Sequence, residues 1–311
     1  MRTAFIQELI LQAQRHPEIF LVVGDLGFSV VEPFAEEFPD RYLNAGVAEQ
    51  NMTGVAAGLA SEGYHVFTYS IANFPTLRCL EQIRNDVCYH GLPVTVVSVG
   101  AGTSYGNLGY SHHAVQDLAI MRSLGGITVL SPADPGETRE CLKWLVAHPC
   151  PSYLRLGKAG EAELHHQAGV DGGPICVRQS SGGVALVATG SILKIAIESA
   201  ELAARAGYPI GVYSMPWIHP LDSQRLAVLN RFQHIFALEE HVSMGGMGSS
   251  LRENLPASTV VESVAYPLEL LSRVGSQNYL RKLAGLTAEE LVKKVVSLKN
   301  DSQTAPILNI V

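Results

Sequence analysis

Short, almost unbroken runs of Val, Ile and Leu alternate with segments of helical periodicity along this chain of 311 residues. Parallel strands that are buried on both faces have such runs, and the helices between them produce the alternation. The sequence therefore predicts a doubly wound α/β domain. An amphipathic helix is expected within residues 1–20. Strands are expected at 19–25, 65–70, 92–102, 127–134 and 152–157, and helices at 47–61, 77–88, 114–123 and 135–147.

The alternation stops at a polar, glycine-rich segment and then starts again. Residues 157–174 have no regular hydrophobic period, which is typical of a linker. We therefore predict two α/β domains with mostly parallel sheets, at 1–165 and 181–311, joined by a linker at 166–180. In the second domain, strands are expected at 183–190, 209–215, 234–241 and 258–265, and helices at 193–206, 222–230, 249–254 and 287–298. Thr287 and Glu290 form a capping box at the start of the last helix.

Charge, hydropathy and cysteine content exclude several classes of function. A net charge of −7 without a basic run gives no general attraction to nucleic acid or to an anionic membrane. No apolar run reaches transmembrane length, and the N-terminal segment carries Glu8 and Glu18, unlike a signal peptide. The five cysteines are odd in number and lack CxxC spacing. This usage predicts reduced thiols in a cytoplasmic protein and no metal site.

One carboxylate stands out in the segment RYLNAGVAEQNMTGVAAGLASEG, residues 41–63. Glu49 lies near the start of the predicted helix, and Met52, Thr53 and Ala56 share its face. No Lys or Arg lies within one helical turn of it. A buried carboxylate without a cation has a raised pKa and can pass a proton to a ring nitrogen. A solvated carboxylate on the helix surface is the alternative.

Other candidate residues lie where predicted strands end. Tyr69 and Phe74 flank a turn at the C-terminal edge of the first sheet, where open α/β folds bind ligands. A flat aromatic side chain there stacks on a heteroaromatic ring or, alternatively, packs in the core. Arg155 ends the strand at 152–157, which suits an anionic substrate or an interdomain salt bridge.

Two glycine-rich loops are further candidates. Residues 100–117, GAGTSYGNLGYSHHAVQD, join a predicted strand to a helix, and glycine lets a backbone approach a ligand closely. Adjacent helical residues point about 100° apart, so at most one of His112 and His113 would serve a site there. Residues 238–250, LEEHVSMGGMGSS, lack the lysine of a phosphate-binding loop and favour a glycine turn before a helix.

Taken in order, these segments resemble the C-terminal half of transketolase. The likeness runs nearly end to end and includes NAGVAEQNMTGVAAGLA, FTYSIANFPTLRCLEQIRND, GAGTSYGNLGYSHHAVQDLAIMRSL, YLRLG and ALEEHVSMGGMGSS. The resemblance implies a pyrimidine-binding domain of the thiamine-diphosphate-binding fold, followed by the family's C-terminal domain. It also implies transfer of a two-carbon ketol unit from a ketose, expected as its phosphate, to an aldose.

The resemblance further implies roles for single residues. Glu49 and His112 would be catalytic, with Glu49 bonded to N1′ of the aminopyrimidine of thiamine diphosphate. The other residues implied to bind this cofactor are Asp25, Tyr69, Phe74 and Arg78. The residues implied to bind the substrate are Ser29, Leu108, His112 and Arg155. Leu108 stands where the family often has an acid, and Gly100 where some members have a histidine, so the expected donor is not an ordinary pentose or heptulose phosphate.

The sequence has no GDG segment with an asparagine some thirty residues later, through which the family binds the diphosphate and Mg²⁺. The resemblance therefore implies a separate N-terminal-half subunit that holds this ion, in an α2β2 assembly. Two alternatives stay open. One is a β-type subunit of another thiamine enzyme, either 2-oxo acid dehydrogenase E1 or an enzyme like deoxyxylulose-phosphate synthase. The other is a non-catalytic regulatory or scaffold homologue.

Overall fold

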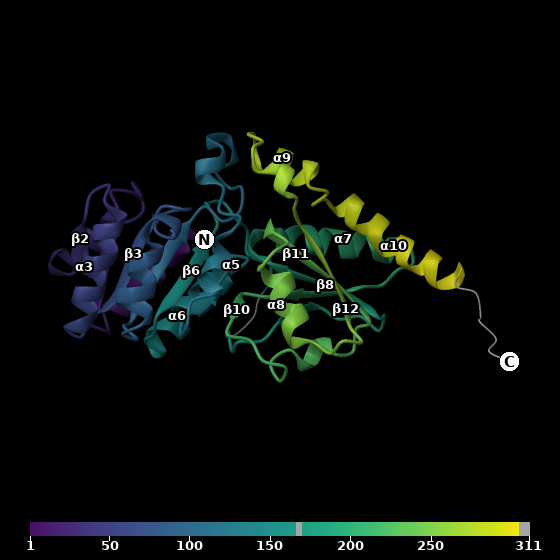
Figure 1. Cartoon of the computed structure of the whole chain (residues 1–311), viewed down its shortest axis with the longest axis horizontal. Coiled ribbons are helices and arrows are strands. Elements are labelled where there is room, and N and C mark those ends of the chain that lie inside the picture. Colours follow the sequence, from purple (N-terminus) through teal and green to yellow (C-terminus); the bar gives the residue numbers. More distant parts are fainter. Residues whose placement is uncertain (166–169, 305–311) are drawn as a thin grey trace.

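The computed structural model describes residues 1–165 and 170–304, with side chains as far as residue 298. Figure 1 shows two α/β domains side by side, each built around one sheet. The first sheet has seven strands in the order β10-β5-β6-β4-β3-β1-β2, and the second has five in the order β12-β11-β8-β9-β7. The prediction of two α/β domains with mostly parallel sheets is confirmed.

The first sheet is parallel except for β10, which pairs antiparallel with β5. Its strands are β1 (Ile19–Val23), β2 (Tyr42–Asn44), β3 (His65–Ile71), β4 (Val94–Val99), β5 (Thr128–Leu130), β6 (Ser152–Leu156) and β10 (Trp217–His219). The helices of this domain are α1 (Arg2–Ala13), α2 (Glu32–Glu37), α3 (Glu49–Ser61), α4 (Leu80–Gln82), α5 (Asp117–Arg122) and α6 (Pro135–Ala147).

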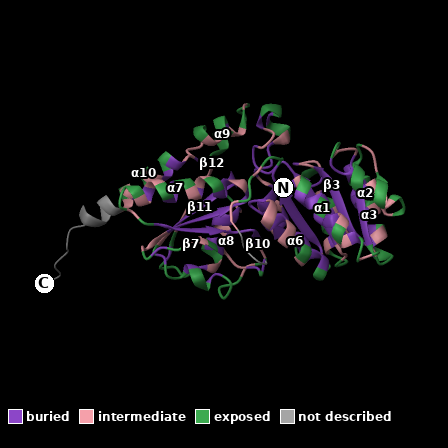
Figure 2. Ribbon diagram, turned by 180° about the vertical axis from the view of Figure 1, so that it is seen from behind, coloured by how far each residue is buried: buried purple, intermediate pink, exposed green. Residues whose placement is uncertain are grey.

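Helices cover both faces of this sheet. Side chains of α1 and α6 pack with Leu21 and Val23 of β1 in one core cluster, whereas side chains of α3 pack with Phe20 and Val22 in another. Successive residues of a strand point to opposite faces, so both clusters draw on the same strand. Figure 2 shows the result, with buried strands inside and helices exposed on their outer sides.

The second sheet is parallel except for the edge strand β7, which pairs antiparallel with β9. Its strands are β7 (Ile175–Arg178), β8 (Val184–Thr189), β9 (Gly211–Ser214), β11 (His234–Val242) and β12 (Val260–Tyr266). The helices of this domain are α7 (Leu193–Arg205), α8 (Met247–Asn254), α9 (Gln277–Leu283) and α10 (Ala288–Thr304). Thr287 Oγ1 accepts a hydrogen bond from the backbone N–H of Glu290, which confirms the predicted cap before α10.

Several segments differ from the prediction. Of the predicted linker, residues 166–169 lie outside the described residues, whereas Ile175–Arg178 is a strand of the second sheet. The predicted helix at 222–230 is a series of turns that contains one 3₁₀ turn, Ala227–Leu229. There the Asp222 carboxylate accepts a hydrogen bond from the backbone N–H of Arg225, a local bond that competes with a helix. The short elements α2, β2 and α9 were not predicted.

The strand β10 joins the two halves of the chain. It follows β9 of the second sheet but pairs with β5 of the first, with Trp217 opposite Leu130. The ring of Trp217 meets that of Trp144 on α6 edge-on, at 4.6 Å between centroids. A strand from the second half of the sequence therefore completes the sheet of the first half.

His65 provides a pH test of the packing around β3. Its side chain is 3% exposed, and its ring lies 4.6 Å from that of Phe67. Burial lowers the pKa of His65 from 6.5 to about 4. Between these two pH values the unfolded chain binds a proton that the folded chain does not, so the free energy of unfolding falls as the pH falls. We expect a loss of about 2–3 kcal/mol from this residue, measured by urea denaturation at pH 7 and 4.5.

His65→Gln is the matched comparison, since it cannot take up this proton. We expect the free energy of unfolding of this variant to depend less on pH than that of the parent chain. The same pH dependence in both proteins would contradict the assignment.

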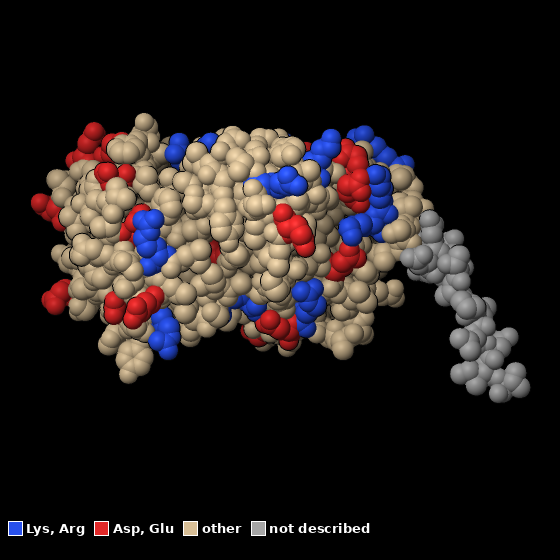
Figure 3. All heavy atoms as spheres, turned by 45° about the horizontal axis from the view of Figure 1, so that its top comes forward, with Lys and Arg blue, Asp and Glu red and all other residues tan. Residues whose placement is uncertain are grey.

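Within the described residues, no helix combines the length and apolar character needed to cross a membrane. Figure 3 shows acidic and basic side chains interspersed on one face of the molecule, with an uncharged stretch across its middle.

Candidate active site

Glu49 is the first residue of α3, and its side chain is 1% exposed. Its Oε1 accepts a hydrogen bond from Ser70 Oγ at 3.3 Å, and its Oε2 pairs with Arg78 Nη1 at 2.6 Å. The predicted burial is confirmed, and the solvated alternative is excluded. The expectation of a carboxylate without a cation was wrong, because the guanidinium of Arg78 comes from the segment after β3 and not from the same helix.

Two cavities meet at Arg78. Glu49 lines the first, of about 380 Å³, together with Val47, Ala48, Gln50, Asn51 and Arg78. The second, of about 260 Å³, is lined by Asn73, Phe74, Leu77, Arg78, Tyr110, Ser111 and Gln116. Val47 is 74% exposed and Tyr110 57%, so large apolar side chains stand open beside the buried carboxylate.

Phe74, Arg78 and His112 form a row beside these cavities. Arg78 Cζ lies 4.6 Å from the centroid of the Phe74 ring, and the His112 ring meets Phe74 edge-on at 5.2 Å. Burial lowers the pKa of His112 below its usual value, and His113 lowers it further. His113 itself is buried, with Nδ1 at 3.2 Å from the carbonyl oxygen of Leu271. Only His112 of the pair therefore contacts this row.

Three loop residues have backbone conformations that non-glycine residues rarely adopt. Asp25 (φ 56°) and Ser29 (φ 63°) follow β1, and Ala72 (φ 46°) follows β3. Such strain is concentrated at binding sites. Asp25 Oδ1 accepts a hydrogen bond from Asn44 Nδ2 at 2.9 Å. A Cβ atom on the neighbouring Gly24 would lie 3.4 Å from Glu49 Cγ, so the loop that carries Asp25 passes close to Glu49.

Tyr69 does not belong to this site. It is 1% exposed, and its ring stacks on Phe5 of α1 at 6.0 Å between centroids. Alternate residues of β3 point to opposite faces of the sheet, so Ser70 reaches Glu49 while Tyr69 points to α1. The prediction that Tyr69 forms a wall around the cofactor was wrong, and its alternative, core packing, is what the structure has.

Arg155 is also buried, with 1% exposure. Its Nε and Nη2 donate to the two carboxylate oxygens of Asp117 at 2.7 and 3.2 Å. Nη2 also donates to the carbonyl oxygens of Ala114 at 2.6 Å and Glu240 at 2.9 Å. The ion pair lies within the first domain, and the bond to Glu240 crosses to the second. These contacts contradict the predicted grip on a substrate phosphate, because the guanidinium is enclosed and already occupied.

The remaining predicted residues lie in exposed loops. Ser29 is exposed, and its backbone N–H donates to Glu32 Oε1 at 2.8 Å. Leu108 is 59% exposed at the tip of the glycine-rich loop. The loop at 238–250 is structural, as predicted: the buried Glu239 carboxylate accepts hydrogen bonds from the N–H groups of Met247 and Gly248 at the start of α8.

Sequence reasoning missed Ser70 and Asn73. Ser70 donates to Glu49, and Asn73 Nδ2 donates to the carbonyl oxygens of Ser111 at 3.3 Å and His113 at 3.0 Å. Side chains alternate between the two faces of the sheet along β3, so a polar residue next to Tyr69 lies on the opposite face. This alternation could have identified Ser70. Nothing local identifies Asn73, since its partners are about forty residues away.

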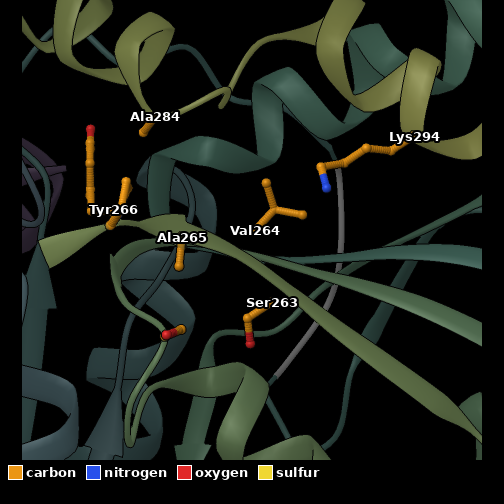
Figure 4. A pocket seen from close by; sticks show the side chains of 8 residues that line it. Ser263, Val264, Ala265, Tyr266, Ala284 and Lys294 are labelled. Carbon is orange, nitrogen blue, oxygen red and sulfur yellow. The ribbon is translucent and has the colours of Figure 1, made fainter. Parts of the chain in front are cut away.

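Another cavity, of about 280 Å³, lies in the second domain. Ser263, Val264, Ala265 and Tyr266 of β12 line it together with Ala284 and Lys294 (Figure 4). Lys294 Nζ is paired with Glu262. None of the lining side chains is among the buried polar groups left without a partner in the described part of the chain. Nor do the described residues contain three or more His, Cys, Asp or Glu side chains grouped to hold a metal ion. The edge of the first sheet is therefore the candidate site.

The fold and the site define a two-domain α/β protein with a buried glutamate and an aromatic–histidine row at the C-terminal edge of its first sheet. The chain belongs to the transketolase family. Residues 1–160 match the family described as "Transketolase, pyrimidine binding domain", and residues 174–291 match "Transketolase, C-terminal domain".

Two relatives of similar length are named as transketolase subunits. The chain is 31% identical to a subunit of the apulose-4-phosphate transketolase of Actinobacillus succinogenes, covering 94% of this chain and 96% of that one. It is 32% identical to 6-deoxy-6-sulfo-D-fructose transketolase subunit SqwH of a Clostridium species, covering 94% and 92%. A solved structure described as "Split gene transketolase, inactive beta4 tetramer" matches with a TM-score of 0.83 at 32% identity, covering 95% and 96%.

The Pichia stipitis transketolase in complex with sedoheptulose-7-phosphate matches with a TM-score of 0.77 at 21% identity. The match covers 95% of this chain but 45% of that one, and it supports the fold alone.

Proposed function

We propose that this chain is the subunit of a split transketolase that contributes the pyrimidine-binding half of the active site. The proposed reaction transfers a two-carbon ketol unit from a ketose to an aldose. The observation that carries the proposal is the buried Glu49 in the wall of a cavity at an exposed sheet edge. The relatives, which are named as transketolase subunits, support the same reaction.

We propose thiamine diphosphate as the cofactor. When bound, it supplies the chemistry that breaks and forms the carbon–carbon bond beside the ketose carbonyl. Glu49, Phe74 and Arg78 would hold its aminopyrimidine ring. The fit rests on two observations. Each carboxylate oxygen of Glu49 accepts one hydrogen bond here and can accept another. Phe74 is half-buried and presents an aromatic ring beside Arg78.

Glu49 is proposed to hold a proton between its carboxylate and a ring nitrogen of the cofactor. Arg78 Nη1 occupies one acceptor position of Glu49 Oε2, and the same oxygen can accept a second hydrogen bond from the ring. The enclosed face of Glu49 keeps water from competing for that hydrogen bond. These two features let one carboxylate serve both the empty and the occupied site.

His112 and Leu108 are proposed to contact the donor sugar. The lowered pKa of His112 makes its imidazole neutral at pH 7, so its ring can exchange hydrogen bonds with a sugar hydroxyl. The Leu108 side chain cannot form a hydrogen bond, so a sugar hydroxyl that is buried against it would lose its hydrogen bond to water without a replacement. We therefore propose a donor other than the ordinary pentose and heptulose phosphates. Ser29 remains a proposed contact of a phosphate tail, and Arg155 does not.

We propose a partner subunit that holds the diphosphate and Mg²⁺, in an α2β2 assembly. Large apolar side chains stand exposed on the loops around the candidate site: Phe28, Val47, Leu77, Leu108 and Tyr110. A surface of this kind marks an interaction site. The relatives named as transketolase subunits, and the solved structure described as a "split gene" enzyme, point to the same organisation.

The five cysteines are free, which supports the expected cytoplasmic location.

Reconstitution tests this function directly. We expect the chain to co-purify from its host with a stoichiometric subunit that carries a GDG segment and a later asparagine, with thiamine diphosphate bound. The pair should transfer a ketol unit between sugars, and the chain alone should not. Coupled assays with a panel of ketose donors and aldose acceptors measure both.

Four outcomes would contradict the proposal in different ways. Tight cofactor binding and turnover by the chain alone would remove the need for a partner. Oxidative decarboxylation of 2-oxo acids would favour a 2-oxo acid dehydrogenase, and condensation of pyruvate with an aldehyde would favour deoxyxylulose-phosphate synthase. A stable pair without cofactor or turnover would favour the regulatory homologue.

A further inference from the structure

We propose that the second domain positions the loop that carries Leu108 and His112, with Glu240 and Gln277 as the positioning residues. Through this loop the second domain would set the affinity for the donor sugar. The kinetic part of the proposal rests on the proposed function, whereas the anchoring of the loop does not.

The base of the loop lies directly against β11 of the second domain. Gly102 and Ala114 close the loop through two backbone hydrogen bonds, of 3.0 and 2.9 Å. A Cβ atom on Gly102 would lie 2.4 Å from Glu240 Cβ, and the φ of Gly102 is +62°, so only glycine allows this approach. Arg155 donates to the carbonyl oxygens of both Ala114 and Glu240. The two ends of the loop are therefore fixed to the second domain.

The Glu240 side chain continues this contact. It is 3% exposed and accepts hydrogen bonds from Thr103 Oγ1 in the loop and from Tyr266, Gln277, Arg281 and Ser191 in its own domain. Burial alone would raise the pKa of Glu240, but Arg281 and Gln277 outweigh burial and lower it. A buried carboxylate that is ionised and fully hydrogen-bonded holds its donors in one arrangement.

The tip of the loop lies against the segment around α9. The carbonyl oxygen of Gly106 accepts a hydrogen bond from Gly275 N–H at 3.2 Å. A Cβ atom on Gly106 would lie 2.5 Å from the carbonyl oxygen of Gly275 and 2.6 Å from Leu280 Cδ1. Figure 1 shows this loop and α9 side by side at the top of the molecule.

Gln277 links the two anchors. Its Nε2 lies 3.3 Å from Ser104 Oγ in the loop and 2.9 Å from Glu240 Oε2. His113, next to His112, reaches the carbonyl oxygen of Leu271 in the same segment. The second domain therefore holds the loop on one side, while Asn73 of the first domain holds it on the other. His112 is kept beside Phe74 by both.

Gln277→Met tests the proposal with little change in side-chain size, and Gly106→Ala pushes the loop tip away from α9. Asn278→Met is the control, because Asn278 is the exposed neighbour of Gln277 on the same helix. Backbone hydrogen exchange is measured on the full chain. We expect backbone exchange within residues 103–113 to quicken about three- to tenfold in the two test variants. Exchange in the strands of the first sheet should not change in these variants, and exchange within 103–113 should not change in the control.

Kinetics of the enzyme assembled with its partner subunit supply the second readout. We expect the KM for the ketose donor to rise about three- to tenfold while kcat stays within about twofold. Unchanged exchange in 103–113 in both test variants would overturn the anchoring. Faster exchange with an unchanged KM would overturn the link to the donor. If the parent assembly transfers no ketol unit, the proposed function fails, and the exchange result still decides the anchoring.

Discussion

Replacing Glu49 with Gln should lower ketol transfer by about 10²–10⁴-fold in the enzyme assembled with its partner. The amide keeps the size of the side chain and can still accept from Ser70, but it cannot carry the proton that the proposed role requires. Arg78 loses its ion pair, yet its partly exposed side chain can turn to water. We therefore expect the fold and the assembly to survive. Single-turnover assays and size-exclusion chromatography measure the two effects.

Glu62→Gln is the matched control for this experiment. Glu62 is exposed at the C-terminal end of α3, so the same chemical change falls on the same helix away from both cavities. The control should retain full activity. An assembled Glu49→Gln enzyme with parental turnover would remove Glu49 from the mechanism and favour the regulatory homologue.

Replacing Arg155 with Leu should lower the free energy of unfolding by about 3–5 kcal/mol. The substitution leaves the Asp117 carboxylate buried with Tyr153 as its remaining side-chain donor, at 2.6 Å. It also removes the donor shared by the carbonyl oxygens of Ala114 and Glu240. A buried charge without its counter-ion is far more costly than the loss of an exposed pair. Urea denaturation followed by circular dichroism measures the change.

Arg139→Leu provides the comparison, because Arg139 pairs with Glu163 at 2.6 Å on the exposed side of α6. That variant should lose at most about 1 kcal/mol. The double variant Asp117→Leu with Arg155→Leu should recover part of the loss, since no unpaired charge remains. If the Arg155→Leu variant instead kept the parental stability and had a raised KM for a sugar phosphate, the result would favour the substrate-binding role of Arg155 that the structure contradicts.

Local patterns in the sequence were sufficient to predict most strands of both sheets and the burial of Glu49, but not the strands β2, β7 and β10. Runs of Val, Ile and Leu mark strands buried on both faces, and three apolar or small neighbours one or two turns along the helix mark an enclosed helix face. These signals depend on residues within a few positions of one another.

Contacts between distant segments were not predictable from those patterns. Arg78 reaches Glu49 across 29 positions, and Arg155 reaches Asp117 across 38, so neither pair leaves a local trace. The direction of Tyr69 is a different case: the alternation along β3 places it opposite Ser70, but the sequence does not tell which face lies under α1. The loop at 100–117 was identified by its glycines, yet its anchors lie in the other domain.

The strand β10 also determines whether the two halves of the chain stay together after the chain is cut between them. A break after residue 160 severs the polypeptide between the two sheets, but Trp217 stays paired with Leu130 and packed on Trp144. The two fragments should therefore migrate together under native conditions and separate only in denaturant. A fragment that ends at residue 165 would instead leave one edge of β5 without a neighbour, and such unpaired edges recruit other chains. The molecule is thus interleaved rather than modular, so two domains in the sequence do not make two independently expressible proteins.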